Sequence, residues 1–183
     1  PRYDDLSNIQ TGKDNPSGYR MVEFPLYQSM AFIIHKLVPW FNLETILRLI
    51  NIFASLGTGL FLYLILREWT NNDKAGLLGA FFYLFLPYSI YYSRTILPDT
   101  LAVFFASGSV YFFGKLGLLG KLGKLGEKSL LILAMSLAAL ALLVKPTTGF
   151  LLTPVPYLFY NRFGKLGILR GLGLLGIITL PFL

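Results

Sequence analysis

Two acidic and two cationic side chains of this sequence stand at the edges of apolar runs, where they could act on a substrate. The acids are Glu23 and Asp99, and the cations are Arg94 and Lys145. A carboxylate can take a proton from an acceptor hydroxyl, and a cation can stabilise the phosphate that leaves a lipid-linked donor. This combination of groups would suit glycosyl transfer from a lipid phosphate.

Each of these residues also has an ordinary structural explanation. Asp99 follows Pro98 and suits the first turn of a helix, where the helix dipole favours an acid by about 0.3–1 kcal/mol. Arg94 suits the membrane interface, where its long side chain can reach the lipid headgroups, and Lys145 suits a helix end for the same reason and through the dipole. Glu23 precedes an expected helix and could be an acid of its capping region.

The composition is that of a membrane protein. Hydrophobic residues make up 55% of the 183 positions, the mean hydropathy is +0.62, and charged residues make up 14%, against about a quarter in soluble domains. The sequence has no cysteine, which excludes disulfides and thiolate metal sites. The net charge of +7 does not indicate nucleic acid, because the basic residues interrupt apolar runs and form no single dense polar face. We therefore expect membrane lipids as partners, and no nucleic acid.

The apolar runs predict an all-α fold, a polytopic bundle of transmembrane helices. An uncharged run of about 18 residues has the length of a span. Uncharged runs cover residues 49–66, 75–93, 100–114 and 129–144, a fifth apolar run covers 150–160, and a sixth starts at 171. Residues 25–38 are apolar but too short to cross about 30 Å of hydrocarbon. We expect this segment to be a helix at the membrane interface, and the Gly-, Leu- and Lys-rich residues 114–128 to be a loop.

The expected organisation has two parts. Residues 1–44 form an outer loop with a juxtamembrane helix, and residues 45–183 form a transmembrane module of five spans and a truncated sixth. Small residues at helical spacing, Ser55 with Gly59 and Gly76 with Gly79, allow neighbouring helices to approach closely. Because the last residue falls inside an apolar run, we interpret the chain as a fragment and expect it to be inactive alone.

The charged loops predict the orientation of the bundle. If residues 1–48 lie outside the cytoplasm, the segments around Arg94 and Lys145 share that side. Most cations of the short loops then fall on the cytoplasmic side, as the positive-inside rule requires. These cytoplasmic cations are Arg67, Lys74, Lys115, Lys121, Lys124, Lys128, Arg162, Lys165 and Arg170.

Four short motifs, in order along the chain, resemble a known superfamily. They are Glu-Phe-Pro-Leu-Tyr-Gln at 23–28, Arg48 followed by a span, Tyr-Tyr-Ser-Arg at 91–94 with Leu-Pro-Asp at 97–99, and Val-Lys-Pro-Thr at 144–147. The sequence resembles, over about residues 20 to 160, the membrane glycosyltransferases of the dolichyl-phosphate-mannose protein mannosyltransferase and aminoarabinose transferase superfamily.

The resemblance implies a C-type glycosyltransferase fold, in which an outer loop with juxtamembrane helices caps a helical membrane module. It also implies a multi-pass protein of the cell membrane whose active site faces away from the cytoplasm. Such enzymes take a sugar from a polyprenyl-phosphate donor, without a cofactor, and invert the anomeric centre. The acceptor is a lipid, a glycan or a protein.

The same resemblance implies roles for individual residues. The principal catalytic aspartate of the superfamily lies in the first outer loop, and Asp4 and Asp5 are the nearest candidates for it, unless it lies before Pro1. Asp99 is a further catalytic candidate, and Glu23, Arg94 and Lys145 are candidates for substrate binding. Some relatives carry a phosphate-binding lysine at the position of Phe24, so Arg94 or Lys145 would take over that role here.

Two other functions compete with this hypothesis. A secondary transporter or flippase of an anionic or lipid-linked solute would show inverted internal symmetry and polar residues at mid-span, whereas these runs are apolar at their centres. A catalytically silent membrane scaffold would bind no donor. We expect no metal site, because the lone His35 has no other ligand type at a suitable spacing.

Overall fold

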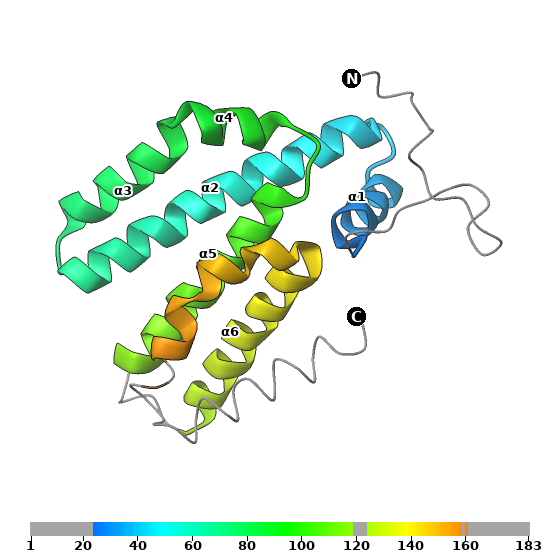
Figure 1. Ribbon diagram of the computed structural model, residues 1–183. Helices are drawn as coiled ribbons and strands as arrows, with labels where there is room; N and C mark the ends of the chain where they lie inside the picture. Colours follow the sequence, from blue (N-terminus) through cyan, green and yellow to red (C-terminus); the bar gives the residue numbers. More distant parts are fainter. Residues whose placement is uncertain (1–23, 119–123, 159, 161–183) are drawn as a thin grey trace, which may run out of the picture.

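The computed structural model describes residues 24–118, 124–158 and 160, and most of these residues are helical, with no strand among them. The all-α class predicted from the sequence is therefore confirmed for this part of the chain. The helices are α1 (Leu26–Leu37), α2 (Leu43–Thr70), α3 (Asp73–Phe85), α4 (Pro87–Arg94), α5 (Asp99–Leu118) and α6 (Lys124–Val144), followed by the 3₁₀ helix η2 (Pro146–Leu152). Figure 1 shows α3 and α4 running back along α2, with α6 beside α5.

The longest helix, α2, is the one that is long and apolar enough by itself to cross a membrane among the described residues. Its 28 residues reach about 42 Å at 1.5 Å per residue. The helices α3 and α4 meet the same criteria only when they are taken together as one bent span. The structure thus gives one or two candidate spans, and the five spans with a sixth stay a prediction.

The second expected span, residues 75–93, is not one straight helix. It is broken between α3 and α4, whose axes are bent by 59°. Leu86 adopts an extended backbone, and Pro87 begins α4 at its first position. Proline lacks the backbone N–H and fits the first turn of a helix but not its interior. The number of apolar residues in this run therefore did not predict the break in the helix, which Pro87 causes.

The expected loop at residues 114–128 is also mostly helical where the structure describes it. Helix α5 continues to Leu118, and α6 already begins at Lys124. The leucines and lysines between the glycines are good helix formers, so the low-complexity composition does not by itself end a helix. The short stretch between the two helices lies outside the described residues.

Small residues bring neighbouring helices close together. A Cβ atom added to Gly76 in α3 would lie 2.7 Å from the backbone oxygen of Tyr63 in α2, and one added to Gly59 would lie 3.0 Å from Leu84. Between α5 and α6, Ser109 is buried and its hydroxyl donates to the carbonyl of Ala134 at 2.9 Å. The small-residue spacing in the sequence therefore marked real helix contacts.

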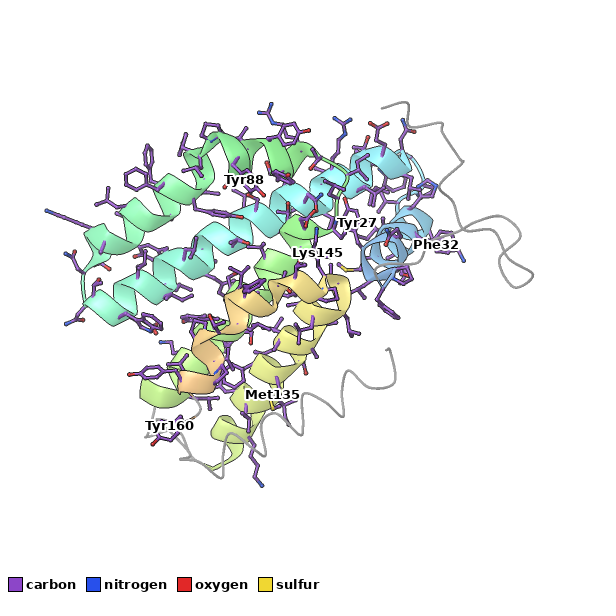
Figure 2. The ribbon with its side chains drawn as sticks, in the orientation of Figure 1. Tyr27, Phe32, Tyr88, Met135, Lys145 and Tyr160 are labelled. Atoms are coloured by element: carbon purple, nitrogen blue, oxygen red, sulfur yellow. The ribbon has the colours of Figure 1, made fainter. Side chains whose placement is uncertain are left out.

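Helix α1 is a short helix, as expected for residues 25–38. Its Tyr27 side chain is 1% exposed, and its hydroxyl donates to the carbonyl of Leu47 in α2 at 2.8 Å. Burial raises the pKa of Tyr27 to about 12, so the phenol stays protonated and keeps this bond at neutral pH. On the other face, Phe32 points away from the helices (Figure 2) and is 55% exposed. An apolar face of this kind suits contact with lipid.

Charged side chains gather at the two ends of the helices. Asp99 and Lys145 meet at one end, and Glu68 and Lys115 meet at the other, 2.5 Å apart. Along α5 the two ends are separated by 16 residues, which is about 24 Å. The intervening parts of α2 to α6 carry no charge among the described residues. Large apolar side chains are exposed on their outer surface, including Phe53, Leu56, Leu60, Leu77, Phe81 and Phe85.

Candidate functional site

A pocket opens at the end of the helices where Asp99 and Lys145 meet. Its volume is about 240 Å³, and α3, α4, α5 and η2 contribute its walls. The lining residues are Tyr83, Tyr88, Ser89, Tyr92, Asp99, Thr100, Val103, Lys145, Thr147, Thr148 and Leu151. Charged, aromatic and hydroxyl groups thus share one small cavity.

The central feature of the pocket is an ion pair that joins two helices. The Nζ atom of Lys145 donates to Oδ1 of Asp99, and the two side chains are 29% and 27% exposed, respectively. Asp99 is the first residue of α5, directly after Pro98, and Lys145 directly follows α6. Figure 2 shows Lys145 at this end of α6. The structure therefore brings together two residues that the sequence singled out 46 positions apart.

Aromatic rings form a second wall of the pocket. The rings of Tyr88 and Tyr92 lie 4.3 Å apart between centroids, and Tyr91 packs edge-on against Tyr92 at 5.3 Å. Tyr88 and Tyr92 line the pocket beside Asp99. Their place in the pocket was not predicted, although the motif at 91–94 contains Tyr92 and was a usable signal. Tyr88 is exposed and Tyr92 is half-buried, and aromatic rings at the wall of a pocket can pack against a sugar ring.

Hydroxyl groups fix the walls of the pocket. Thr100 donates to the carbonyl of Tyr92 at 3.1 Å and so ties α5 to α4. Thr148 donates to the carbonyls of Ala141 and Lys145, at 3.0 and 2.7 Å, and so ties η2 to α6. These bonds use the hydroxyl hydrogens of both threonines within the protein. Thr100 and Thr148 therefore shape the site, and the pair formed by Asp99 and Lys145 carries its charge.

The connection between α4 and α5 is held from α2 by Asn51. Its Nδ2 atom donates to the carbonyl of Thr95 at 2.6 Å and to that of Leu97 at 2.9 Å. The side chain is fully buried, at 0% exposure. Asn51 was not predicted, because it is uncharged like the rest of the run at 49–66 and no motif contains it.

Arg94 does not join the pocket. It ends α4, is exposed, and is absent from the residues that line the cavity. Within the described chain no ion pair involves Arg94. Its position at the pocket's end of the helices fits contact with headgroups, and its predicted contact with substrate stays a prediction.

The remaining predicted site residues are not described by the structure. Asp4, Asp5 and Glu23 lie outside the described residues, and their roles stay predictions. Among the residues that are described, no three His, Cys, Asp or Glu side chains are grouped closely enough to hold a metal ion. His35 instead has its Nδ1 atom 3.0 Å from the carbonyl oxygen of Phe41.

Helices with uncharged centres and an apolar outer surface are the features of a membrane protein, and here a pocket with an ion pair opens at one end of them. A comparison with protein families identifies the family. The sequence model of the dolichyl-phosphate-mannose-protein mannosyltransferase family matches residues 33–176. The chain belongs to this family of integral membrane glycosyltransferases, which use lipid-linked sugar donors. This membership favours a transferase over the alternative of a transporter.

Two further comparisons gave no match, one with curated proteins and one with solved structures. The matched segment contains α2 to α6 and both residues of the ion pair.

Proposed function

We propose that this protein transfers a sugar from a polyprenyl-phosphate donor to a hydroxyl group of a lipid, glycan or protein acceptor at the extracytoplasmic face of the membrane. The observation that carries the proposal is the ion pair of Asp99 and Lys145 on the wall of a pocket lined with tyrosines. A phosphate needs a cation, a hydroxyl nucleophile needs a carboxylate, and a sugar ring packs well on an aromatic surface.

In the proposed reaction, the acceptor oxygen attacks the anomeric carbon from the side opposite to the phosphate. The new glycosidic bond forms while the bond from that carbon to the phosphate oxygen breaks, and the phosphate keeps the electron pair. The configuration of the carbon is therefore inverted. The acceptor hydroxyl gives its proton to a carboxylate, and Lys145 stabilises the charge on the departing polyprenyl phosphate.

Asp99 has two tasks in this proposal. It holds the ammonium group of Lys145 at the pocket, and it accepts a hydrogen bond from the acceptor hydroxyl. Asp4, Asp5 or an acid that precedes Pro1 would supply the further carboxylate of the site. Glu23 would contact the substrate from the first loop, and Arg94 would meet the donor phosphate at the entrance of the pocket.

Lys145→Ala should weaken binding of the donor about 10-fold to 100-fold. The substitution removes the cation that faces the phosphate and leaves Asp99 as an unpaired negative charge, and a hydrogen bond to a charged group contributes about 1.5–3 kcal/mol. The measurement is binding of a radiolabelled polyprenyl-phosphate hexose to the whole encoded protein in lipid nanodiscs. A polyprenol of equal length without phosphate shows how much of the binding comes from the lipid tail alone.

Lys115→Ala is the matched control for this experiment. Lys115 also forms a half-buried ion pair between two helices, with Glu68, but at the opposite end of the molecule. Its loss should affect stability in a similar way and leave donor affinity within about twofold of the unmutated protein. Equal donor affinity in Lys145→Ala and the unmutated protein would remove the basis of the proposed site.

A labelling experiment tests which face of the membrane holds the site. The chain has no cysteine, so Arg94→Cys and Lys74→Cys each provide a unique thiol at an exposed position at opposite ends of the helices. In sealed vesicles with the extracytoplasmic face outward, an impermeant maleimide should label Arg94→Cys directly and Lys74→Cys only after permeabilisation. The reverse pattern would place the pocket on the cytoplasmic face.

A further inference from the structure

Asn51 is buried in α2 and contacts the connection that leads into the site. One side-chain nitrogen donates to two carbonyl oxygens, those of Thr95 and Leu97, at 2.6 and 2.9 Å. Leu97 is only two residues before Asp99. Asn51 does not line the pocket itself, so any effect on the reaction must pass through this connection.

Besides the bonds from Asn51, the hydrogen bonds of the connection among the described residues stay within the segment from α4 to α5. Thr95 and Thr100 both donate to the carbonyl of Tyr92, at 3.0 and 3.1 Å, and these bonds lie within the segment from α4 to α5. Pro98 has no backbone N–H to donate. The bonds from Asn51 tie this segment to the longest helix, and so they fix where α5 begins and where its first side chain points.

The orientation of the Asn51 amide follows from its neighbours. Two carbonyl oxygens face one end of the amide, so that end must be the nitrogen, because an oxygen there would face two acceptors. The Oδ1 atom at the other end is buried and has no hydrogen-bond partner within the described residues. A buried polar atom without a partner is unfavourable for folding.

We propose that Asn51 is a positioning residue for glycosyl transfer, which sets the carboxylate of Asp99 against Lys145 without touching the substrate. The inference depends on the proposed function. If Asn51 no longer holds Leu97, the start of α5 can shift, and a displacement of about 1 Å at a reacting group lowers a rate by about 100-fold.

Asn51→Leu tests the proposal, because leucine has the same branched arrangement of four side-chain heavy atoms and cannot donate. Transfer by the whole encoded protein should fall between about tenfold and 100-fold, with the protein still folded. Asn51→Asp should lower it at least as far, because a carboxylate would face the two carbonyl oxygens. Thr58→Val is the matched control, since Thr58 is a buried polar residue on the same helix and donates only to Ala54, one turn away.

A double-mutant cycle separates positioning from a general loss of stability. In an Asp99→Asn background, Asn51→Leu should reduce transfer by less than about twofold further, because the group that it positions is already disabled. An equal loss in both backgrounds, or a transfer rate in Asn51→Leu equal to that of the unmutated protein, would overturn the proposal. A loss that Thr58→Val reproduces would do so too.

Hydrogen exchange gives a readout that does not depend on activity. The first amide of α5 that donates to a backbone carbonyl is that of Ala102, to Pro98 at 3.0 Å. Amide hydrogens of residues 102–105 should therefore exchange faster in Asn51→Leu than in the unmutated protein, while those in the middle of α2 should not change. If the protein transfers no sugar but this exchange pattern holds, the proposed function fails while the positioning of α5 by Asn51 stands. Unchanged exchange at residues 102–105 would reject the positioning role itself.

Discussion

Asp99→Asn should lower the rate of glycosyl transfer by about 100-fold and leave the fold intact. Asparagine has the same shape, and the lost interaction of the acid with the helix dipole costs only about 0.3–1 kcal/mol, so α5 can still begin after Pro98. The variant removes the negative charge that holds Lys145 and that polarises the acceptor hydroxyl, a role that typically contributes about 100-fold or more. Donor affinity should stay the same or rise, because the anionic phosphate no longer competes with a carboxylate for Lys145.

The measurement is the initial rate of transfer to an acceptor in membranes that contain the whole encoded protein, with donor binding measured in parallel. Glu68→Gln is the control, because Glu68 forms the equivalent pair with Lys115 at the other end of the helices. It should transfer at close to the unmutated rate. If Asp99→Asn is as active as Glu68→Gln, then Asp99 serves only the start of its helix.

Gly76→Ala should destabilise the protein by roughly 1–3 kcal/mol, the cost of overpacking a close contact. The new methyl group would lie 2.7 Å from the backbone oxygen of Tyr63 and 2.8 Å from its ring. The backbone oxygen cannot rotate away, so α2 and α3 must separate. Alanine otherwise favours a helix by about 1 kcal/mol over glycine, and a net loss therefore means that the clash outweighs this gain.

Gly114→Ala gives the matched comparison within α5. A Cβ atom there would meet its nearest neighbour, the indole nitrogen of Trp69, at an ordinary 3.5 Å. This variant should be as stable as the unmutated protein or more stable. Thermal unfolding in one detergent, followed by circular dichroism, compares the two. Equal melting temperatures for Gly76→Ala and Gly114→Ala would show that α2 and α3 are not in close contact.

The sequence predicted the helices and part of the site for definite physical reasons. Apolar runs bounded by charges located α2, α5 and α6, because few other structures can bury so many uncharged residues. The alternation of apolar runs and polar loops also predicted that Asp99 and Lys145 lie on the same side of the membrane. Their direct contact could not be predicted, because it depends on how α5 and α6 pack through small residues such as Ser109 and Ala134.

The rest of the pocket could not be predicted from the sequence, because it depends on the break between α3 and α4. Counting apolar residues treats positions 75–93 as one span, whereas Pro87 starts a new helix at 59° to the previous one. Tyr88 and Tyr92 line the pocket from this second helix. Asn51 could not be predicted from the sequence for another reason. Its side chain donates hydrogen bonds to two backbone carbonyls that lie more than 40 positions away in the chain.

The ion pair between Asp99 and Lys145 also bears on how the protein enters the membrane. If the pocket faces away from the cytoplasm, two charged residues must cross the hydrocarbon during biosynthesis. They are Asp99 at the start of α5 and Lys145 directly after the end of α6. Moving a single charged side chain to the centre of a bilayer costs roughly 2.5–3.5 kcal/mol on insertion scales. Asp99 and Lys145 lie at the ends of α5 and α6 that are opposite to residues 119–123, which connect the two helices. If the two side chains pair before they cross, they cross as an acid and a base whose charges cancel. The contact that serves the reaction would then also lower the cost of translocating these two helix ends.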